Sequence, residues 1–355
     1  MRRDGTEENQ GPRLNIDEPP LETGASPFRA ETAKVPPDTV TSAYAPTHPT
    51  LSTCSLLIFA TIWGVLARLG LEWIGGFAAG RAVFALVWAQ VVGSFVMGIV
   101  NERKASVERL FPPLFPALGT GFCGSLTTWS SMANDVFTAF ANLDEPARTS
   151  RFAGFLAGVA ITFVTLTTSS SALQGGLQVG AAMPATGSPP RLLPGQSMIA
   201  LLSLVAGPLF WLGSLFLLIF GPTSWRERAT FAIVVAPPAT LLRYFLSKRL
   251  NPFSKRFPIG TFTANSLAVL VFAVMALLAR NPRSPLGCAA LRGVQDGFCG
   301  SLSTISTLVV EVRGLGTGDS YRYLLASWII SMALFTVVLG PWVWSDDRGP
   351  LCWER

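Results

Sequence analysis

Residues 121–136 read GFCGSLTTWSSMANDV, and residues 297–312 read GFCGSLSTISTLVVEV. The two stretches align without a gap and share nine identities in sixteen positions. Each places two glycines and a serine inside an otherwise apolar run, where they weaken helix continuity and free backbone carbonyls. The duplicated motif predicts two homologous halves, each containing a membrane span that is broken at the same place.

The composition favours a membrane protein over a soluble enzyme. Half of the 355 residues are apolar and only 14% are charged, against about 25% in a typical soluble domain. The single histidine disfavours imidazole catalysis and His-based zinc sites. We expect no enzyme activity, no organic cofactor and no nucleic-acid partner. The apolar runs predict an all-α membrane protein with nine transmembrane helices, over residues 54–75, 82–100, 114–138, 152–173, 198–220, 229–247, 259–279, 289–311 and 322–344.

These spans divide into two four-helix repeats, residues 54–173 and 229–344, joined by a single linker helix at 198–220. Because one helix separates the repeats, the second enters the membrane from the opposite side, which makes them an inverted duplication. Residues 174–197 are rich in glycine, proline and alanine, a composition that predicts a loop acting as a flexible tether.

The two ends of the chain are expected to lie outside the membrane. Residues 1–50 carry 5 basic and 8 acidic side chains and predict a disordered cytosolic tail, while residues 345–355 form a short C-terminal tail. The loops on the two sides of the membrane carry nearly equal numbers of basic residues, so these residues do not decide the orientation of the chain. The long acidic tail is the reason to place the N-terminus in the cytosol. Five cysteines, an odd number, indicate neither a disulfide framework nor a metal-spaced cluster.

A stripe of hydroxyl groups that ends in a carboxylate follows each motif on one helix face. The stripes consist of Thr128, Ser131 and Asp135 in the first repeat and of Thr304, Thr307 and Glu311 in the second. Such hydroxyls either satisfy the backbone of a neighbouring helix or line a polar path, and the sequence leaves both roles open for each of them.

One amide lies inside the second span of each repeat, Gln90 in the first and Asn265 in the second. Interhelical bonding is the commoner role of such an amide, but the matching positions favour a functional one. Tyr323, Ser327 and Ser331 are spaced by four on the last span and share a face. Because hydroxyl, amide and phenol groups donate hydrogen bonds and carry no fixed charge, they indicate a path for a small anion.

Arg68 and Arg243 occupy matching depths in the first span of each repeat, and snorkelling to the interface is their expected role. Other classes of protein remain open at this point. Inverted repeats also serve substrate-coupled exporters of small organic compounds. Proton coupling in such an exporter needs an acid well inside the bundle. Asp135 and Glu311 lie near span ends, which counts against this class. A scaffold subunit without transport is the third class.

Over residues 54–344 the sequence resembles the fluoride channel family (CrcB/Fluc). The resemblance rests on a glycine-rich first span with an arginine, on GTFTAN at 260–265 and on the duplicated motif. In each copy of the motif, an acid follows eight residues after the Thr or Ser at position 127 or 303. The fused nine-span arrangement resembles the eukaryotic, mainly fungal, fluoride exporters. The resemblance implies a passive, selective fluoride path across the plasma membrane. It also implies that a single chain acts as a pseudo-dimer, with fluoride and the lipid bilayer as its partners.

The resemblance implies residue roles as well. Asn265 would be the pore amide and Tyr323, Ser327 and Ser331 the polar track. Vestibule acids would be Asp135 and Glu311, and the family's first-span arginine corresponds to Arg68 and Arg243. A structural sodium ion would lie at the interface of the two repeats. Its ligands would be the backbone oxygens of Gly124, Thr127, Gly300 and Ser303.

The sequence also departs from the family pattern. The family's paired phenylalanines are replaced by Trp129 and Met132 in the first repeat and by Ile305 and Leu308 in the second. Only Trp129 keeps an aromatic edge for the pathway, and Gln90 stands where the family has asparagine. These departures predict that one of two ancestral pores has decayed. Asn265→Asp is then expected to abolish transport, while Gln90→Ala is tolerated.

Overall fold

The computed structural model describes residues 48–77, 84–143, 150–184, 196–222, 227–281, 284–345 and 352. Every regular element in this part of the chain is a helix. The all-α prediction is therefore confirmed for the described residues. The predicted tail at 1–50 lies outside them except for its last three positions.

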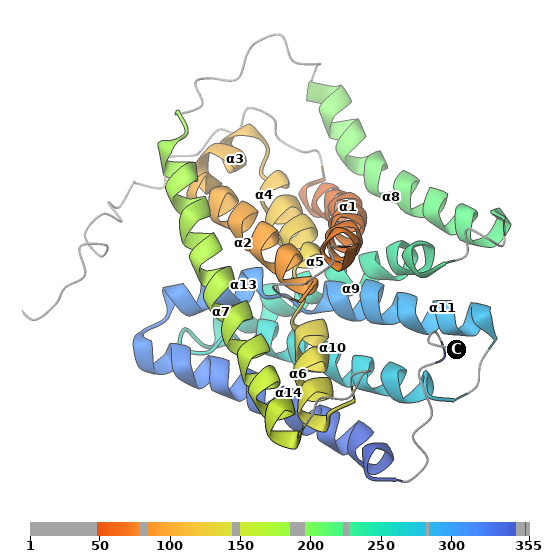
Figure 1. Ribbon diagram of the computed structural model, residues 1–355. Coiled ribbons are helices and arrows are strands. Elements are labelled where there is room, and N and C mark those ends of the chain that lie inside the picture. Colours follow the sequence, from red (N-terminus) through yellow and green to blue (C-terminus); the bar gives the residue numbers. More distant parts are fainter. Residues whose placement is uncertain are drawn as a thin grey trace, which may run out of the picture. The chain divides into compact units, whose positions relative to one another are not determined.

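The first half of the chain contains three long helices and one broken span (Figure 1). Its continuous helices are α1 Pro49–Phe77, α2 Leu86–Glu102, the short α3 Lys104–Leu110 and α7 Arg151–Ala182. The broken span comprises α4 Leu114–Pro116, the π-helix η2 Ala117–Cys123, α5 Gly124–Leu126 and α6 Trp129–Ala141.

The second half repeats this order after α8, which spans Gln196–Phe220. Its continuous helices are α9 Arg228–Leu250, the 3-10 turn η4 Asn251–Phe253, α10 Ile259–Leu278 and α14 Thr317–Val343. Its broken span comprises α11 Pro285–Val294, the π-helix η5 Gln295–Cys299, α12 Gly300–Leu302 and α13 Ser306–Gly314. The two halves therefore share both the order of elements and the place of the break.

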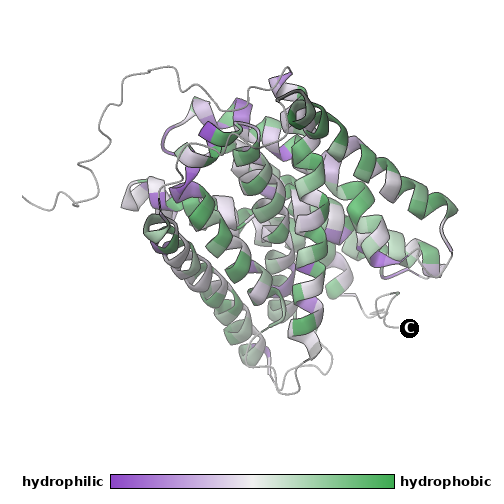
Figure 2. Ribbon diagram, turned by 90° about the horizontal axis from the view of Figure 1, so that it is seen from above, coloured by the Kyte–Doolittle hydropathy of each residue, from purple (hydrophilic) through white to green (hydrophobic). Residues whose placement is uncertain are grey.

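Six of the described helices are long and apolar enough to cross a membrane (Figure 2). They are Pro49–Gly76, Arg151–Ala182, Met198–Phe220, Arg228–Phe253, Ile259–Leu278 and Thr317–Val343. The shorter apolar helix α2 follows α1. The predicted spans at 114–138 and 289–311 are not continuous helices, because each is interrupted within its duplicated motif.

The interruption has the same form in both halves. The Gly-Phe-Cys segments form the ends of two π-helices, and the chain then leaves the helix at Thr127, Thr128 and Ser303. Thr127 has φ −97° and ψ 147°, and Ser303 has φ −92° and ψ 161°, which are extended conformations. The backbone groups freed at these positions must find partners inside the protein.

The predicted tether between the halves is partly wrong. Helix α7 continues to Ala182, so residues 175–182 are helical, and residues 185–195 lie outside the described part. The physical reason is packing, because Gly176 and Gly180 are buried against α2, where a Cβ would collide with the Phe95 carbonyl and the Glu102 side chain. Figure 1 shows α7 alongside α2. These glycines allow two helices to approach closely, as small residues do in membranes.

Helix α8 packs on α1 and α9. The Gly207 N–H donates to Ser55 Oγ at 3.0 Å, and the Trp211 indole donates to the Val234 carbonyl at 2.8 Å. The other face of α8 is exposed and apolar, as expected of a helix that faces lipid. In chain order, α8 is the only long helix between the two homologous halves within the described residues.

We expect Gly98→Val to destabilise the protein. A Cβ at Gly98 would lie 2.8 Å from the Leu177 nitrogen and 2.9 Å from Gly176 Cα, so α2 and α7 must separate. Overpacking of this kind costs about 1–3 kcal/mol. Thermal unfolding of the purified protein in detergent measures the loss. Gly213→Val on the outer face of α8 is the matched control, since a Cβ there meets nothing within 4 Å; equal loss in both variants would contradict the packing argument.

Candidate functional site

The two broken spans meet at their breaks. Ser303 Oγ accepts hydrogen bonds from the backbone N–H groups of Trp129 at 3.2 Å and Ser130 at 3.0 Å, at the start of α6. Thr127 Oγ1 accepts from the N–H of Ser306 at 3.1 Å, at the start of α13. Each break therefore supplies a capping acceptor to the helix start in the other repeat, and α6 also has its own N-cap, Thr128.

A second pair of bonds crosses the interface beside these caps. Ser130 Oγ donates to the Cys299 carbonyl at 3.1 Å, and Ser306 Oγ donates to the Cys123 carbonyl at 3.3 Å. All four residues are fully buried. The matching bonds relate the two halves residue by residue, and they reach carbonyls that also accept from the N–H groups of Thr127 and Ser303 at 3.0 Å.

The predicted hydroxyl stripes serve these helix starts. Thr128 Oγ1 accepts from the Ser131 N–H, and Thr304 Oγ1 accepts from the Thr307 N–H, both at 3.4 Å. Thr128 and Thr304 are buried, whereas Ser131 and Thr307 are half-buried. Thr128 and Thr304 thus each satisfy a backbone N–H at the start of the helix that follows them.

The two intramembrane amides brace the breaks. Asn265 accepts from the Thr304 N–H at 2.9 Å and donates to the Thr304 carbonyl at 3.3 Å. Gln90 does the same for Thr128, accepting at 3.2 Å and donating at 2.7 Å. Both amides are buried. Because Gln90 carries the same pair of bonds as Asn265, its truncation to alanine leaves buried backbone groups unpaired, a cost that the sequence did not reveal.

Snorkelling is wrong for both arginines. Arg68 and Arg243 are only 1% and 2% exposed, and both guanidinium groups point inward to carbonyls of the first broken span. Arg68 donates to the Ser125 carbonyl at 2.9 Å, while Arg243 donates to the carbonyls of Gly124 at 3.0 Å and Thr120 at 2.6 Å. The arginines therefore bind the backbone that the breaks and π-helices expose.

Each guanidinium also crosses to the opposite repeat. A Cβ added to Gly300 would collide with the guanidinium of Arg68, and one added to Gly124 would collide with that of Arg243. The second glycine of each duplicated motif thus makes room for an arginine from the other half. This contact explains why both motifs keep glycine at that position.

Acidic side chains neutralise only part of this buried charge. Arg228 bonds to Asp296 and to Glu72, the latter at 2.9 Å, and Glu72 lies 3.8 Å from Arg68. Arg68 also donates to the Asp296 backbone carbonyl. Three arginines, counting Arg243, face two carboxylates, so this cluster carries one net positive charge. Sequence reasoning missed its acids, although Glu72 follows Arg68 by one helical turn.

The expected sodium ligands overlap with the contacts of Arg243. Two of the four oxygens, the carbonyls of Gly124 and Ser303, already accept hydrogen bonds from Arg243 Nη1 at 3.0 and 3.5 Å. A sodium ion at this set would share its oxygens with a guanidinium and add to a cluster that is already positive. The set fits the guanidinium better than a free cation.

The predicted polar track lies on one buried face of α14. Tyr323 donates to Glu311 Oε2 at 2.9 Å, Ser327 Oγ to the Tyr323 carbonyl at 2.8 Å, and Ser331 Oγ to the Ser327 carbonyl at 2.7 Å. The indole N–H of Trp129 donates to Ser331 Oγ at 2.8 Å. The track therefore joins α14 of the second repeat to α6 of the first.

The two predicted vestibule acids have different surroundings. Glu311 accepts from Thr261 Oγ1 at 2.6 Å, Asn251 Nδ2 at 3.1 Å and the Tyr323 hydroxyl. Asp135 lies half-buried on α6. Glu311 is thus held at one end of the track by three donors, two of which, Asn251 and Thr261, sequence reasoning did not single out.

The remaining positions of the family's phenylalanine pairs belong to the apolar core. Met132, Ile305 and Leu308 are fully buried in one hydrophobic cluster with Trp129. Only Trp129 among the four brings a polar atom to the track. The two halves therefore differ at one of the places where the sequence departs from the family pattern.

The fold and the site define a helical membrane protein built from two homologous halves, with broken spans that meet at a buried polar centre. The family model described as "CrcB-like protein, Camphor Resistance (CrcB)" matches residues 55–176 and 230–341. The chain belongs to this family. The two matched segments coincide with the two halves described above.

Named relatives cover most of the chain. Fluoride export protein 1 of Neurospora crassa is 32% identical over 84% of this chain and 68% of its own length. Fluoride export protein 1 of Candida albicans is 33% identical over 81% of this chain and 79% of its own length. The fluoride-specific ion channel FluC of an Enterobacter species is 32% identical over 26% of this chain and 72% of its own length. No solved structure matches this chain.

Ser303→Ala should lower stability more than Ser301→Ala. Ser303 Oγ caps α6 of the other repeat, and losing such a cap costs about 1–2 kcal/mol. Ser301 is equally buried, but its Oγ has no hydrogen-bond partner among the described residues, so its removal is nearly neutral or stabilising. Unfolding temperatures of both variants in the same detergent compare the two serines. A larger loss for Ser301→Ala would contradict the capping role.

Proposed function

We propose that this protein exports fluoride passively and selectively across the plasma membrane and so confers fluoride resistance. Two relatives that match most of the chain are named fluoride export proteins, and a bacterial relative is named a fluoride-specific ion channel. The structural observation that carries the proposal is the buried track in which Trp129 of one repeat meets Ser331 of the other. A path for a small ion needs such buried polar groups at membrane depth.

Charge supports an anion as the transported species. The cluster of Arg68, Arg228, Arg243, Glu72 and Asp296 has one positive charge more than it has negative ones. Buried charge acts over a longer range than charge in water because it is poorly screened. An anion that enters the protein interior is attracted by this excess, whereas a cation is repelled.

The proposed architecture has nine spans and two inverted four-helix repeats that work as a single-chain pseudo-dimer. Support comes from the two family matches and from the reciprocal caps of Ser303 and Thr127, which are the pairwise bonds expected of a two-fold interface. In this arrangement α8 is the odd helix that reverses the second repeat. The broken segments at 114–138 and 289–311 supply the third span of each repeat.

A single pore, served by the second repeat, is the working path in this proposal. Tyr323, Ser327 and Ser331 form a continuous buried file on α14, and Asn265 lies on the neighbouring α10. The corresponding helix of the first repeat, α7, carries no such tyrosine. The names of the relatives do not favour the alternative, a substrate-coupled exporter of small organic compounds.

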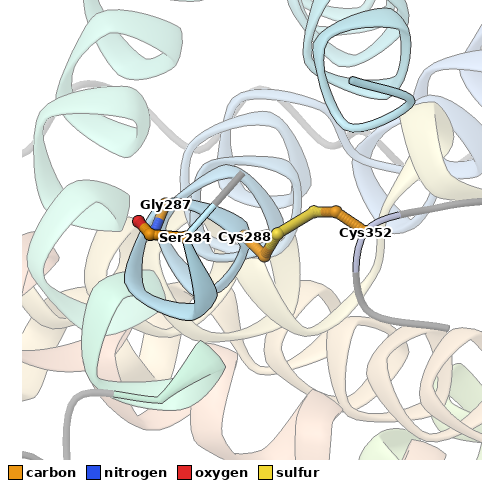
Figure 3. The surroundings of a disulfide bond; sticks show 4 residues. All are labelled: Ser284, Gly287, Cys288 and Cys352. Atoms are coloured by element: carbon orange, nitrogen blue, oxygen red, sulfur yellow. A yellow bond between two sulfur atoms is a disulfide. The ribbon is translucent and has the colours of Figure 1, made fainter. Parts of the chain in front are cut away.

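A disulfide supports a cytosolic N-terminus. Cys288, in α11, is bonded to Cys352 near the C-terminus (Figure 3). The Cys352 N–H donates to the Ala279 carbonyl at 2.9 Å. The sequence did not indicate this bond. Disulfides persist on the oxidising side of a membrane. With nine spans, placing both cysteines outside the cell leaves the N-terminus inside.

Purified protein in vesicles is expected to release fluoride, but not chloride, when an ionophore clamps the membrane potential. Asn265→Asp should abolish this flux, because a buried carboxylate repels the anion and loses the donor to the Thr304 carbonyl. A fluoride electrode records the efflux. Vesicles that release no fluoride, although the folded protein is present, would reject the proposed function.

Gln90→Glu is the matched control for that variant. It makes the same chemical change at the other break, where Gln90 braces Thr128. If the second repeat serves the working pore, Gln90→Glu retains flux in the fraction of protein that stays folded. If Gln90→Glu loses flux while Asn265→Asp retains it, the working pore is served by the first repeat instead.

The orientation can be measured in intact cells. After mild reduction, a membrane-impermeant maleimide should label Cys352 from outside, because Cys352 is bonded to Cys288 on the outer side and is partly accessible. The Cys352→Ser variant tests whether the label is at that residue. Labelling that appears only after the cells are permeabilised would place the C-terminus in the cytosol and reverse the proposed orientation.

A further inference from the structure

The turn between α9 and α10 concentrates basic side chains at one end of these helices. Residues 248–256 read KRLNPFSKR, with four basic residues and no acidic one. All four are exposed, and among the described residues none of them forms an ion pair. They are Lys248, Arg249, Lys255 and Arg256. Like charges this close repel one another, so a negatively charged partner at this turn is favoured.

The same turn exposes an aromatic ring among these charges. Phe253, the last residue of η4, is 78% exposed, the largest exposed fraction of any large apolar side chain that the structure describes. An apolar ring beside basic side chains suits the boundary between lipid headgroups and acyl chains, where the ring enters the apolar layer and the charges meet the headgroups. A soluble anion needs only the charges, whereas a lipid surface uses both features.

The turn is held in one shape by its own polar groups. Asn251 Oδ1 accepts from the Gly260 N–H at 2.7 Å, at the start of α10. Ser254 Oγ accepts from the N–H groups of Arg256 at 3.3 Å and Phe257 at 3.1 Å. Such side-chain bonds fix the backbone of a turn. The basic residues are therefore presented together before any partner arrives, which lowers the entropy lost on binding.

The other half of the chain has no such turn. The equivalent stretch, residues 73–81, reads WIGGFAAGR and has one basic residue. Because the repeats are inverted in the proposed architecture, the two stretches lie on opposite sides of the membrane, and the basic one lies on the side of the N-terminus. The cytosolic leaflet is the one that is rich in acidic lipids. The basic turn therefore faces the negatively charged leaflet.

We propose that residues 248–256 form a docking surface for acidic phospholipids of the cytosolic leaflet. The four basic side chains contact the phosphate and carboxylate oxygens of the headgroup, and the Phe253 ring enters the boundary with the acyl chains. This inference goes beyond the proposed function, because lipid binding does not require transport. It uses the proposed orientation only to name the leaflet.

Lipid binding at this turn acts on a segment that also contacts the polar track. Phe257 packs edge-on against Tyr323, with ring centroids 5.2 Å apart, and Asn251 Nδ2 donates to Glu311 Oε1 at 3.1 Å. A ligand that binds the folded turn and not the unfolded chain stabilises the protein by mass action. Acidic lipid should therefore raise the unfolding temperature of the protein in detergent.

The test measures lipid binding by the full-length protein in detergent. Native mass spectrometry compares phosphatidylserine with phosphatidylcholine of the same acyl chains. The parent protein should bind phosphatidylserine about tenfold more tightly. Lys255→Gln/Arg256→Gln should lose most of this preference, because each basic residue near an acidic lipid surface contributes about fivefold in affinity. Equal affinity of the parent protein for the two lipids would overturn the inference.

Lys104→Gln/Arg109→Gln is the matched control. It removes two charges from α3, which lies on the same side of the membrane in the proposed architecture. Lys104 lies 3.9 Å from Glu108, so an acid already compensates part of the charge of this helix. The control should keep the lipid preference of the parent protein. An equal loss in the two double variants would show that net charge alone attracts the lipid, and it would overturn a site at the turn.

Phe253→Ser separates a lipid from a soluble anion. The variant keeps all four charges but loses the apolar contact, so its affinity for phosphatidylserine should fall about threefold or more. Inorganic phosphate should not displace the lipid from the parent protein. If phosphate displaces the lipid and Phe253→Ser has no effect, the ligand is a soluble anion and the inference is overturned. The substituted residues are exposed, so without lipid all three variants should keep the parent unfolding temperature.

Discussion

The exchange of helix caps between the two halves is the interaction on which the polar centre depends. A helix that begins inside a membrane protein has backbone N–H groups that water cannot reach. Here Ser303 and Thr127 satisfy them across the interface, at α6 and α13. Neither broken span can therefore keep its geometry without the other half. This dependence makes the two repeats one structural unit, whatever the sequence of the rest of the chain.

The caps also explain the buried arginines. A break exposes carbonyls as well as N–H groups, and the guanidinium groups of Arg68 and Arg243 supply several donors to that cluster of oxygens. A glycine at the contact point lets each arginine approach from the other half. The positive charge that remains then follows from the architecture itself: breaking two spans requires donors, and arginine brings a charge with its donors.

Much of this organisation could be predicted from sequence. The duplicated motif located both breaks, and the spacing of Tyr323, Ser327 and Ser331 gave a shared face that proved to be buried. Periodicity and internal repetition report such features because they are local. Contacts between distant segments were not accessible in this way. The inward direction of the arginines, the Arg228 bonds to Glu72 and Asp296, and the bond between Cys288 and Cys352 all depend on which helices become neighbours.

Duplication gave this chain two equivalent centres whose equivalent positions do not all carry the same side chain. Both amides are tied to the breaks, and both arginines are tied to carbonyls, so substitution there removes a buried partner. The indole N–H of Trp129 has no counterpart in the second half, because the equivalent Ile305 has no polar side-chain atom. An indole at that point can add a donor to one track without disturbing the caps. Asymmetry between the halves therefore accumulates in the side chains that face the track, while the interface that holds the two halves together stays symmetric.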